Sequence, residues 1–303
     1  MMSGVTATAA ALQPKRANPW MFRYAVGLAV CLIVLIVLGA AVTSEIQPIP
    51  GGSAPPAPTS GPIELLLEHV HMVAAILVTI LIFGFAAWHQ TTGRSSRSSL
   101  LGWGAVVVAI AECLWGIEGS HSPAGGFFHA LGAQVLFSIV VVLAVGALPN
   151  PELRDLVQDT CRPPLRTLAV VTLSLTLLQV LLGAAYRSGI LGIILHILNA
   201  LIVAIAVLVV CMLTTRQFPD HVALRRAAVA FAVITGIQLA LGFATFTVLL
   251  IGSENLTPLL VLSVAHVTTG ALTVAGSFLF AGQIWRYVQR RAEVTTVPAT
   301  EDA

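Results

Sequence analysis

The chain has 303 residues, of which 57% are hydrophobic and 9% are charged, and its formal net charge is +2. Soluble domains carry about 25% charged residues, so this composition indicates an integral membrane protein. The small net charge and the lack of a basic stripe argue against a nucleic-acid partner. The four cysteines are scattered and form no CxxC pair, which favours neither a disulfide framework nor a zinc site.

Eight apolar stretches are long enough to cross a bilayer, which takes about 20 residues of helix. The predicted spans are 24–44, 64–88, 100–119, 126–147, 166–186, 190–213, 225–251 and 258–286. The sequence therefore predicts an all-α integral membrane protein with eight transmembrane helices.

Basic residues alternate from loop to loop along the chain. One set comprises the N-terminal tail, every second loop and the C-terminal tail, and it contains Lys15, Arg16, Arg23, Arg94, Arg97, Arg154, Arg162, Arg166, Arg216, Arg225, Arg226, Arg286, Arg290 and Arg291. The opposite set contains Arg187 alone among the basic residues. By the positive-inside rule, this pattern predicts that both termini are cytoplasmic. We expect the protein in the cell's inner (plasma) membrane.

An internal repeat divides the predicted spans into two halves. The first span ends in Leu-Gly-Ala-Ala from Leu38, and the fifth ends in the same four residues from Leu182. A histidine then appears early in the second and fourth helices of each half. We expect two pseudo-symmetric four-helix bundles at 24–147 and 166–286, which run parallel because four is even. A cytoplasmic tail at 1–23, a cytoplasmic linker at 148–165 and a second tail at 287–303 complete the predicted organisation.

Four histidines lie within these apolar spans, where an ionisable side chain is costly without a partner. They are His71, His129, His196 and His266, on the second, fourth, sixth and eighth spans. The predicted topology places all four in the outer half of the membrane. Two facing pairs of neutral imidazoles are the ligands that two six-coordinate haem irons would require.

The second span offers two histidines for one of these positions. His69 and His71 are two residues apart, so they point about 200° apart around a helix and cannot both bind one iron. His71 is three residues after Glu68 and shares a helix face with it, which favours His71 and leaves His69 as the alternative. Glu68 either faces water near the helix start or assists chemistry beside a porphyrin by moving a proton or stabilising positive charge.

Other polar residues in the spans predict contacts between helices. Glu112 lies deep in the third span and should have a partner, which the sequence does not identify. Gln179 and Gln238 lie mid-span and are expected to bridge helices. Arg187 suits an ion pair with a haem propionate, although a lone interfacial arginine also suits lipid head groups. His89, at the cytoplasmic edge of the second span, is expected to be solvated.

Several short motifs resemble those of the haem A synthase family, over roughly residues 22–290. They are Glu68-His69-Val70-His71, the two Leu-Gly-Ala-Ala segments, the stretch from Gln179 to Gly183 followed by Arg187, Leu195-His196 with Asn199-Ala200, and the stretch from Ala265 to Gly270 that contains His266. Members of this family are eight-span membrane enzymes built of two similar four-helix halves. They oxidise one ring methyl group of haem O to a formyl group, which makes haem A for terminal oxidases.

The resemblance implies a role for each of the singled-out residues. His71 and His129 would flank the substrate haem O in the N-terminal half, and Glu68 matches the catalytic glutamate. His196 and His266 would hold a haem b in the C-terminal half, with Arg187 beside it. The chain departs from the family at Met72 and at 43–44, where members often carry arginines that anchor the haem.

Two other functions use the same histidines. A dihaem b-type cytochrome for electron transfer needs all four but does not need Glu68. A haem carrier or an oxidase assembly factor needs reversible haem binding and no oxidation. For the enzyme, the expected partners are haem O and membrane lipid, while a haem O synthase, an electron donor and a second copy of the chain remain open.

Overall fold

The computed structural model describes residues 18–45, 61–91, 96–119, 122–148, 156–252 and 257–290. Within these ranges the helices are α2 (Pro19–Glu45), α3 (Pro62–Thr91), α4 (Ser96–Gly119), α5 (Pro123–Gly146), α6 (Leu165–Arg187), α7 (Ile193–Gln217), α8 (Val222–Ile251) and α9 (Thr257–Tyr287). Each of these eight helices is long and apolar enough to cross a membrane. The predicted all-α membrane fold and its eight spans are confirmed, and most helices extend a few residues beyond the predicted ends.

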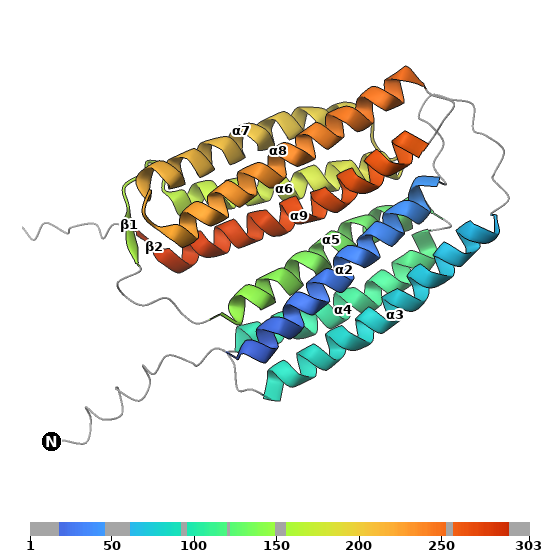
Figure 1. Ribbon diagram of the computed structural model, residues 1–303, viewed down its shortest axis with the longest axis horizontal. Helices are drawn as coiled ribbons and strands as arrows, with labels where there is room; N and C mark the ends of the chain where they lie inside the picture. Colours follow the sequence, from blue (N-terminus) through green and yellow to red (C-terminus); the bar gives the residue numbers. More distant parts are fainter. Residues whose placement is uncertain are drawn as a thin grey trace, which may run out of the picture.

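The helices form two four-helix bundles side by side (Figure 1). In the first, α2, α3, α4 and α5 make a closed ring of neighbours, so α3 and α5 lie diagonally across the bundle. In the second, α6, α7, α8 and α9 repeat the arrangement, with α7 and α9 on the diagonal. Contacts of α9 with α2 and α5, and of α5 with α6, join the bundles in a pseudo-two-fold manner.

Each bundle buries its own apolar core and leaves other apolar side chains on its surface. The fully buried side chains include Ile82 in the first bundle and Phe231 and Phe280 in the second, whose rings stack 5.7 Å apart. On the outside, Ile80 is 61% exposed and Ile205 is 64% exposed. Exposed apolar side chains at this density are the surface that a lipid bilayer covers, so helix association here rests on close packing between helices.

Polar groups close the helix ends, where backbone N–H groups lack partners within the helix. Asn18 accepts hydrogen bonds from the N–H groups of Trp20 and Met21 at the start of α2. The Ser122 hydroxyl accepts from Gly125 N–H, 3.0 Å away, and Pro123 occupies the first turn of α5. These caps fix where α2 and α5 begin.

A two-stranded parallel sheet, which the sequence did not predict, joins the inter-bundle linker to the end of the chain. β1 (Val157–Asp159) pairs with β2 (Val288–Arg290), with Val157 opposite Val288. Three-residue strands are too short to show an alternating pattern, so the sequence alone does not indicate them. Beside β1, burial and the Asp159 carboxylate raise the pKa of the Cys161 thiol, which donates to Gln217, 2.8 Å away.

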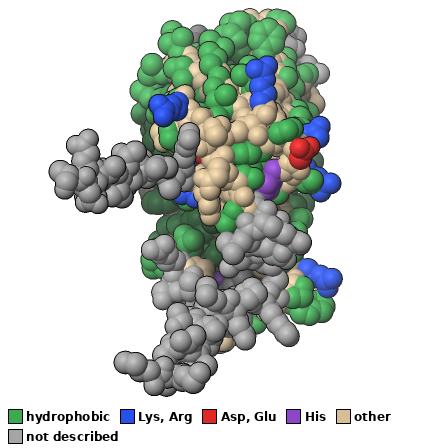
Figure 2. Space-filling view, turned by 90° about the vertical axis from the view of Figure 1, so that its left-hand side faces the viewer, with side chains coloured by type: hydrophobic (Ala, Val, Ile, Leu, Met, Phe, Trp, Pro, Cys, Tyr) green, Lys and Arg blue, Asp and Glu red, His purple; other side chains and the backbone are tan. Residues whose placement is uncertain are grey.

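Arginine side chains are spread over the end of the molecule that carries β1 and β2 (Figure 2). The described arginines near this end are Arg23, Arg162, Arg166, Arg216, Arg225, Arg226 and Arg286. Arg187 ends α6 at the opposite end. His89 lies at the arginine-rich end but is only 3% exposed and packs beside Phe85, so the expectation that it is solvated was wrong. The His89 side chain points from α3 towards the core of the first bundle.

Candidate functional site

The first bundle brings two histidines together across its interior. His71 lies early in α3 and His129 lies early in α5, on the two diagonal helices. Their ring centroids are 6.2 Å apart and their ring planes are perpendicular, at 90°. Both side chains are half-buried. The predicted first pair is therefore in place.

The second bundle repeats this arrangement. His196 lies at the start of α7 and His266 lies early in α9, again on diagonal helices. Their ring centroids are also 6.2 Å apart, with an angle of 78° between the ring planes. Because all four histidines follow the starts of even-numbered spans, both pairs lie towards the same end of the molecule, opposite β1 and β2.

The ring separation suits one iron atom between the members of each pair. A metal-bound imidazole nitrogen lies about 2 Å from the metal and its ring centre lies about 1 Å further, so two opposed imidazoles have centres about 6 Å apart. No group of three or more histidine, cysteine or carboxylate side chains that could hold a metal ion occurs among the described residues. Paired imidazoles without further ligands fit the axial positions of a haem and do not fit a tetrahedral zinc site.

A glycine on the preceding helix packs against each histidine ring. A methyl group added at Gly39 would lie 2.8 Å from Cε1 of His71, and one added at Gly183 would lie 2.9 Å from Cε1 of His196. The other two contacts are Gly116 with His129 at 3.4 Å and Gly242 with His266 at 2.9 Å. Glycine thus lets each ring lie directly against the neighbouring backbone, and Gly39 and Gly183 belong to the repeated Leu-Gly-Ala-Ala segments.

The residue one turn before each glycine differs from helix to helix. Four positions before the glycine stand Leu35 on α2, Glu112 on α4, Gln179 on α6 and Gln238 on α8. Residues four apart share a helix face, so this position lies on the same side as the glycine and its histidine. The repeating unit is therefore a pair of helices, with glycine on the first and histidine on the second, and it occurs four times.

Glu112 has the partner that the sequence did not identify. Its carboxylate Oε2 lies 3.1 Å from Nδ1 of His129, and its backbone oxygen lies 3.2 Å from the same nitrogen. The Glu112 side chain is buried between α4 and α5. The carboxylate fixes the orientation of the His129 ring and leaves Nε2 of that ring for another ligand.

In the second bundle, amides occupy the equivalent positions. Gln179 donates from Nε2 to the His196 backbone oxygen at 3.0 Å, and its Oε1 accepts from Asn199, 2.8 Å away. The same Gln179 nitrogen lies 3.1 Å from Nδ1 of His196. Gln238 Nε2 lies 3.3 Å from Nε2 of His266. Both glutamines bridge helices, as predicted, and in both cases the neighbouring helix residue is a site histidine.

In two of the four histidines, Nδ1 is buried without a hydrogen bond of ordinary geometry. They are His71, whose ring interacts with the Leu35 backbone, and His266, whose ring interacts with the Gln238 backbone. A buried polar atom without a partner costs free energy, and about nine in ten such atoms in proteins are satisfied. For both rings the available partner is therefore the backbone of the residue one turn before the packed glycine, Leu35 or Gln238.

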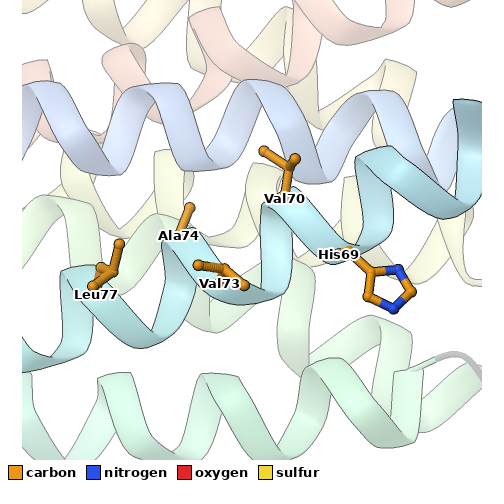
Figure 3. A pocket seen from close by; sticks show the side chains of 5 residues that line it. All are labelled: His69, Val70, Val73, Ala74 and Leu77. Carbon is orange, nitrogen blue, oxygen red and sulfur yellow. The ribbon is translucent and has the colours of Figure 1, made fainter.

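His69 lies outside the pair. Its side chain is exposed, and its Nδ1 lies 2.6 Å from the Leu65 carbonyl oxygen of the same helix. It borders an open apolar hollow along α3, whose lining includes Val73 and Leu77 (Figure 3). Figure 3 shows the His69 ring projecting from the helix surface. Between the two alternatives on this span, the structure brings His71 to His129.

Glu68 is half-buried on α3, one turn before His71. No hydrogen bond or ion pair ties its carboxylate to another described residue. The position agrees with the shared helix face that the spacing predicted. The Glu68 carboxylate is therefore available to a substrate. Its catalytic role stays a prediction.

Arg187 lies at the seam between the bundles. It donates from Nη2 to the Ala40 backbone oxygen of α2, 3.3 Å away, and Ala40 directly follows the glycine that packs on His71. Arg187 also lies within electrostatic range of His266. The guanidinium thus contacts the helix segment behind His71, and its predicted contact with a propionate stays a prediction.

Sequence reasoning found the four histidines but missed what surrounds them. The missed residues are the four glycines as a set, Glu112 as the partner of His129, and the glutamines as partners of His196 and His266. One signal was present: an acid or amide stands four residues before a glycine on three of the odd-numbered spans. No protein-family model matches the chain, and a search of curated proteins found no significant match.

Proposed function

We propose that the protein binds two haems, one between His71 and His129 and the other between His196 and His266. The supporting observation is the 6.2 Å separation of ring centroids in each pair, which suits imidazoles on opposite sides of one iron. The glycine behind each ring adds support, because it allows the ring to lie between the helix backbone and a flat ligand.

We further propose that the chain is an oxidoreductase of the haem A synthase type. Haem O is the substrate, bound in the N-terminal bundle, and haem A is the product. Conversion of the ring methyl group to a formyl group gains one oxygen atom and releases four electrons and four protons, if water is counted as the oxygen source. Molecular oxygen is the ultimate electron acceptor. The motif resemblance and the position of Glu68 support this proposal.

The chain's own residues have distinct tasks in this scheme. His71 and His129 hold the substrate from both faces, and Glu112 fixes the ring of His129. Glu68, one turn from His71, takes up or delivers protons at the substrate edge. In the C-terminal bundle, His196 and His266 hold a haem b, which supplies electron transfer when bound. The lipid-covered surface suits a substrate with a long isoprenoid tail.

The orientation in the membrane is part of the proposal. The end with β1 and β2 carries most of the described arginines, so we assign it to the cytoplasmic side of the inner membrane, with both chain termini. The histidine pairs then lie towards the outer side. A haem O synthase is the source of substrate within the membrane, and a separate donor supplies electrons.

The experiment that tests this function is pigment analysis in a host that makes haem O but no haem A. The chain is expressed there, and extracted haems are separated by chromatography. Haem A is expected in cells that express the chain and not in cells with an empty vector. If only haem O and haem B accumulate while the purified protein is haem-loaded, the enzyme proposal fails and haem binding stands.

Replacing Glu68 with glutamine is expected to abolish haem A formation and to spare the haem spectrum. The amide keeps the shape of the side chain but cannot accept or release the proton. Asp220, an exposed carboxylate at the arginine-rich end, supplies a matched control in the variant Asp220→Ala. Product per molecule of haem-loaded protein is measured for both variants. A Glu68→Gln protein that still makes haem A at the wild-type rate removes Glu68 from the mechanism.

One observation favours a second candidate function. The two pairs have the same ring separation, as two similar redox centres in an electron-transfer cytochrome of b type would have. Such a protein would bind two haems and would make no oxidised pigment in the host described above. A carrier or assembly factor would instead release its haem to an apo-oxidase.

A further inference from the structure

The two bundles are alike in their histidines but differ in the residues that contact those histidines. In the second bundle, each histidine faces a neutral carboxamide, from Gln179 or Gln238. In the first bundle, His129 faces a carboxylate, from Glu112. Because Glu112 and Gln238 occupy equivalent places four residues before a glycine, this is one chemical difference at one repeated position.

The Glu112 carboxylate is built into the helix interface. It is 7% exposed, and it lies against the backbone of Gly132, one turn after His129 on α5. A methyl group at Gly132 would overlap the carboxylate, so the glycine provides the space for it. On α9, Gly270 similarly lies one turn after His266 and faces the Gln238 amide, at 3.3 Å from an added methyl group. The space beside Gly132 therefore accommodates the Glu112 carboxylate, and the space beside Gly270 accommodates the Gln238 amide.

The Glu112 and Gln238 side chains place different chemical groups beside their histidines. Nδ1 of His129 is hydrogen-bonded to the Glu112 backbone oxygen, 3.2 Å away, and the Glu112 carboxylate Oε2 lies 3.1 Å from the same nitrogen, which leaves Nε2 as the ligating atom. The amide nitrogen of Gln238 lies 3.3 Å from Nε2 of His266, the other ring nitrogen, and it can only donate. A carboxylate acceptor makes the imidazole a more basic ligand, whereas an amide donor does not.

A more basic imidazole and a nearby negative charge both stabilise the more positive oxidation state of an iron. In a buried site these electrostatic effects are weakly screened, because the surroundings have a low dielectric constant. Polar and charged groups beside a ligating imidazole are among the means by which a protein sets the potential of a bound haem. The same iron porphyrin should therefore be harder to reduce in the first bundle than in the second.

We infer that Glu112 is a positioning residue that orients His129 and lowers the reduction potential of the haem in the N-terminal bundle below that of the haem in the C-terminal bundle. This inference rests on the proposed binding of two haems. It makes the C-terminal haem the more readily reduced one. At the position four residues before the glycine, α4 then carries a carboxylate where α8 carries an amide.

The test is a spectroscopic redox titration of the purified, haem-loaded protein and of two reciprocal variants. Glu112→Gln should raise one midpoint potential by an amount equivalent to about a tenfold change in the reduction equilibrium, about 59 mV for one electron. Gln238→Glu should lower the other midpoint by a similar amount. The midpoint that is missing from a His71→Ala protein identifies the N-terminal haem.

The outcomes separate this inference from the proposed function. If the wild-type protein binds no haem, both fail. If it binds two haems and Glu112→Gln moves neither midpoint, or moves the C-terminal one, the role of Glu112 is refuted and haem binding stands. If Glu112→Gln does not fold, Gln238→Glu decides alone, because an unchanged or raised C-terminal midpoint in that variant contradicts the inference.

Discussion

Replacing His71 with alanine is expected to remove one of two haems from the purified protein. His71 and His129 lie 6.2 Å apart across the first bundle, so the loss of one ring leaves the iron between them with a single protein ligand. The haem content should fall by half, and the remaining haem should keep the spectrum of an iron with two imidazole ligands. The measurement is haem per chain by pyridine haemochrome assay, together with the absorption spectrum.

His69 provides the matched control for this variant. It is two residues from His71 on the same helix, but it is exposed and its Nδ1 contacts the Leu65 carbonyl oxygen of its own helix. His69→Ala should therefore retain both haems. The opposite result, with haem lost from His69→Ala and kept in His71→Ala, would show that the ligand on α3 has been assigned to the wrong histidine.

Replacing Gly242 with alanine is expected to weaken haem binding in the C-terminal bundle by about 10–100-fold, the range seen when groups that support metal ligands are changed. The added methyl group would lie 2.9 Å from Cε1 of His266, which is closer than real side chains approach, so the ring must move. A displaced ring no longer faces His196 at the separation that an iron requires. Haem retention during dilution or competition with apomyoglobin measures the effect.

Gly236 lies six residues earlier on α8 and serves as the control. A methyl group there meets nothing within 4 Å, so Gly236→Ala should bind haem as the wild-type protein does. Alanine favours helix over glycine by about 1 kcal/mol, so neither variant is expected to lose its helix. Equal haem retention in the two variants would show that the glycine contact with His266 has no part in the site.

The fold could be predicted closely because the local sequence of each span is enough to identify it as a membrane helix. Twenty or more apolar residues between polar loops define a membrane helix without reference to the rest of the protein. The pairing of His71 with His129 followed from the position of each histidine near the start of an even-numbered span. The repeat around Gly39 and Gly183 indicated two similar halves.

The side-chain contacts around the histidines depend on how each helix is oriented about its own axis. The sequence of an apolar span does not reveal that orientation. These spans have apolar residues on all faces, so hydrophobic periodicity does not show which side faces a neighbour. The contact of Glu112 with His129 and the inward direction of His89 are set by such rotations. The pairing of β1 with β2 joins segments from distant parts of the chain, so it could not be predicted from local sequence patterns either.

The most direct measurement of the central claim is the number and ligation of haems in the purified protein. Two haems per chain are expected, and the oxidised protein should show electron paramagnetic resonance signals of low-spin iron with two imidazole ligands at each site. Simultaneous loss of both signals in a His71→Ala and His196→Ala double variant completes the expected result. A folded wild-type protein that contains no haem, or haem without two histidine ligands, would contradict the assignment of both pairs.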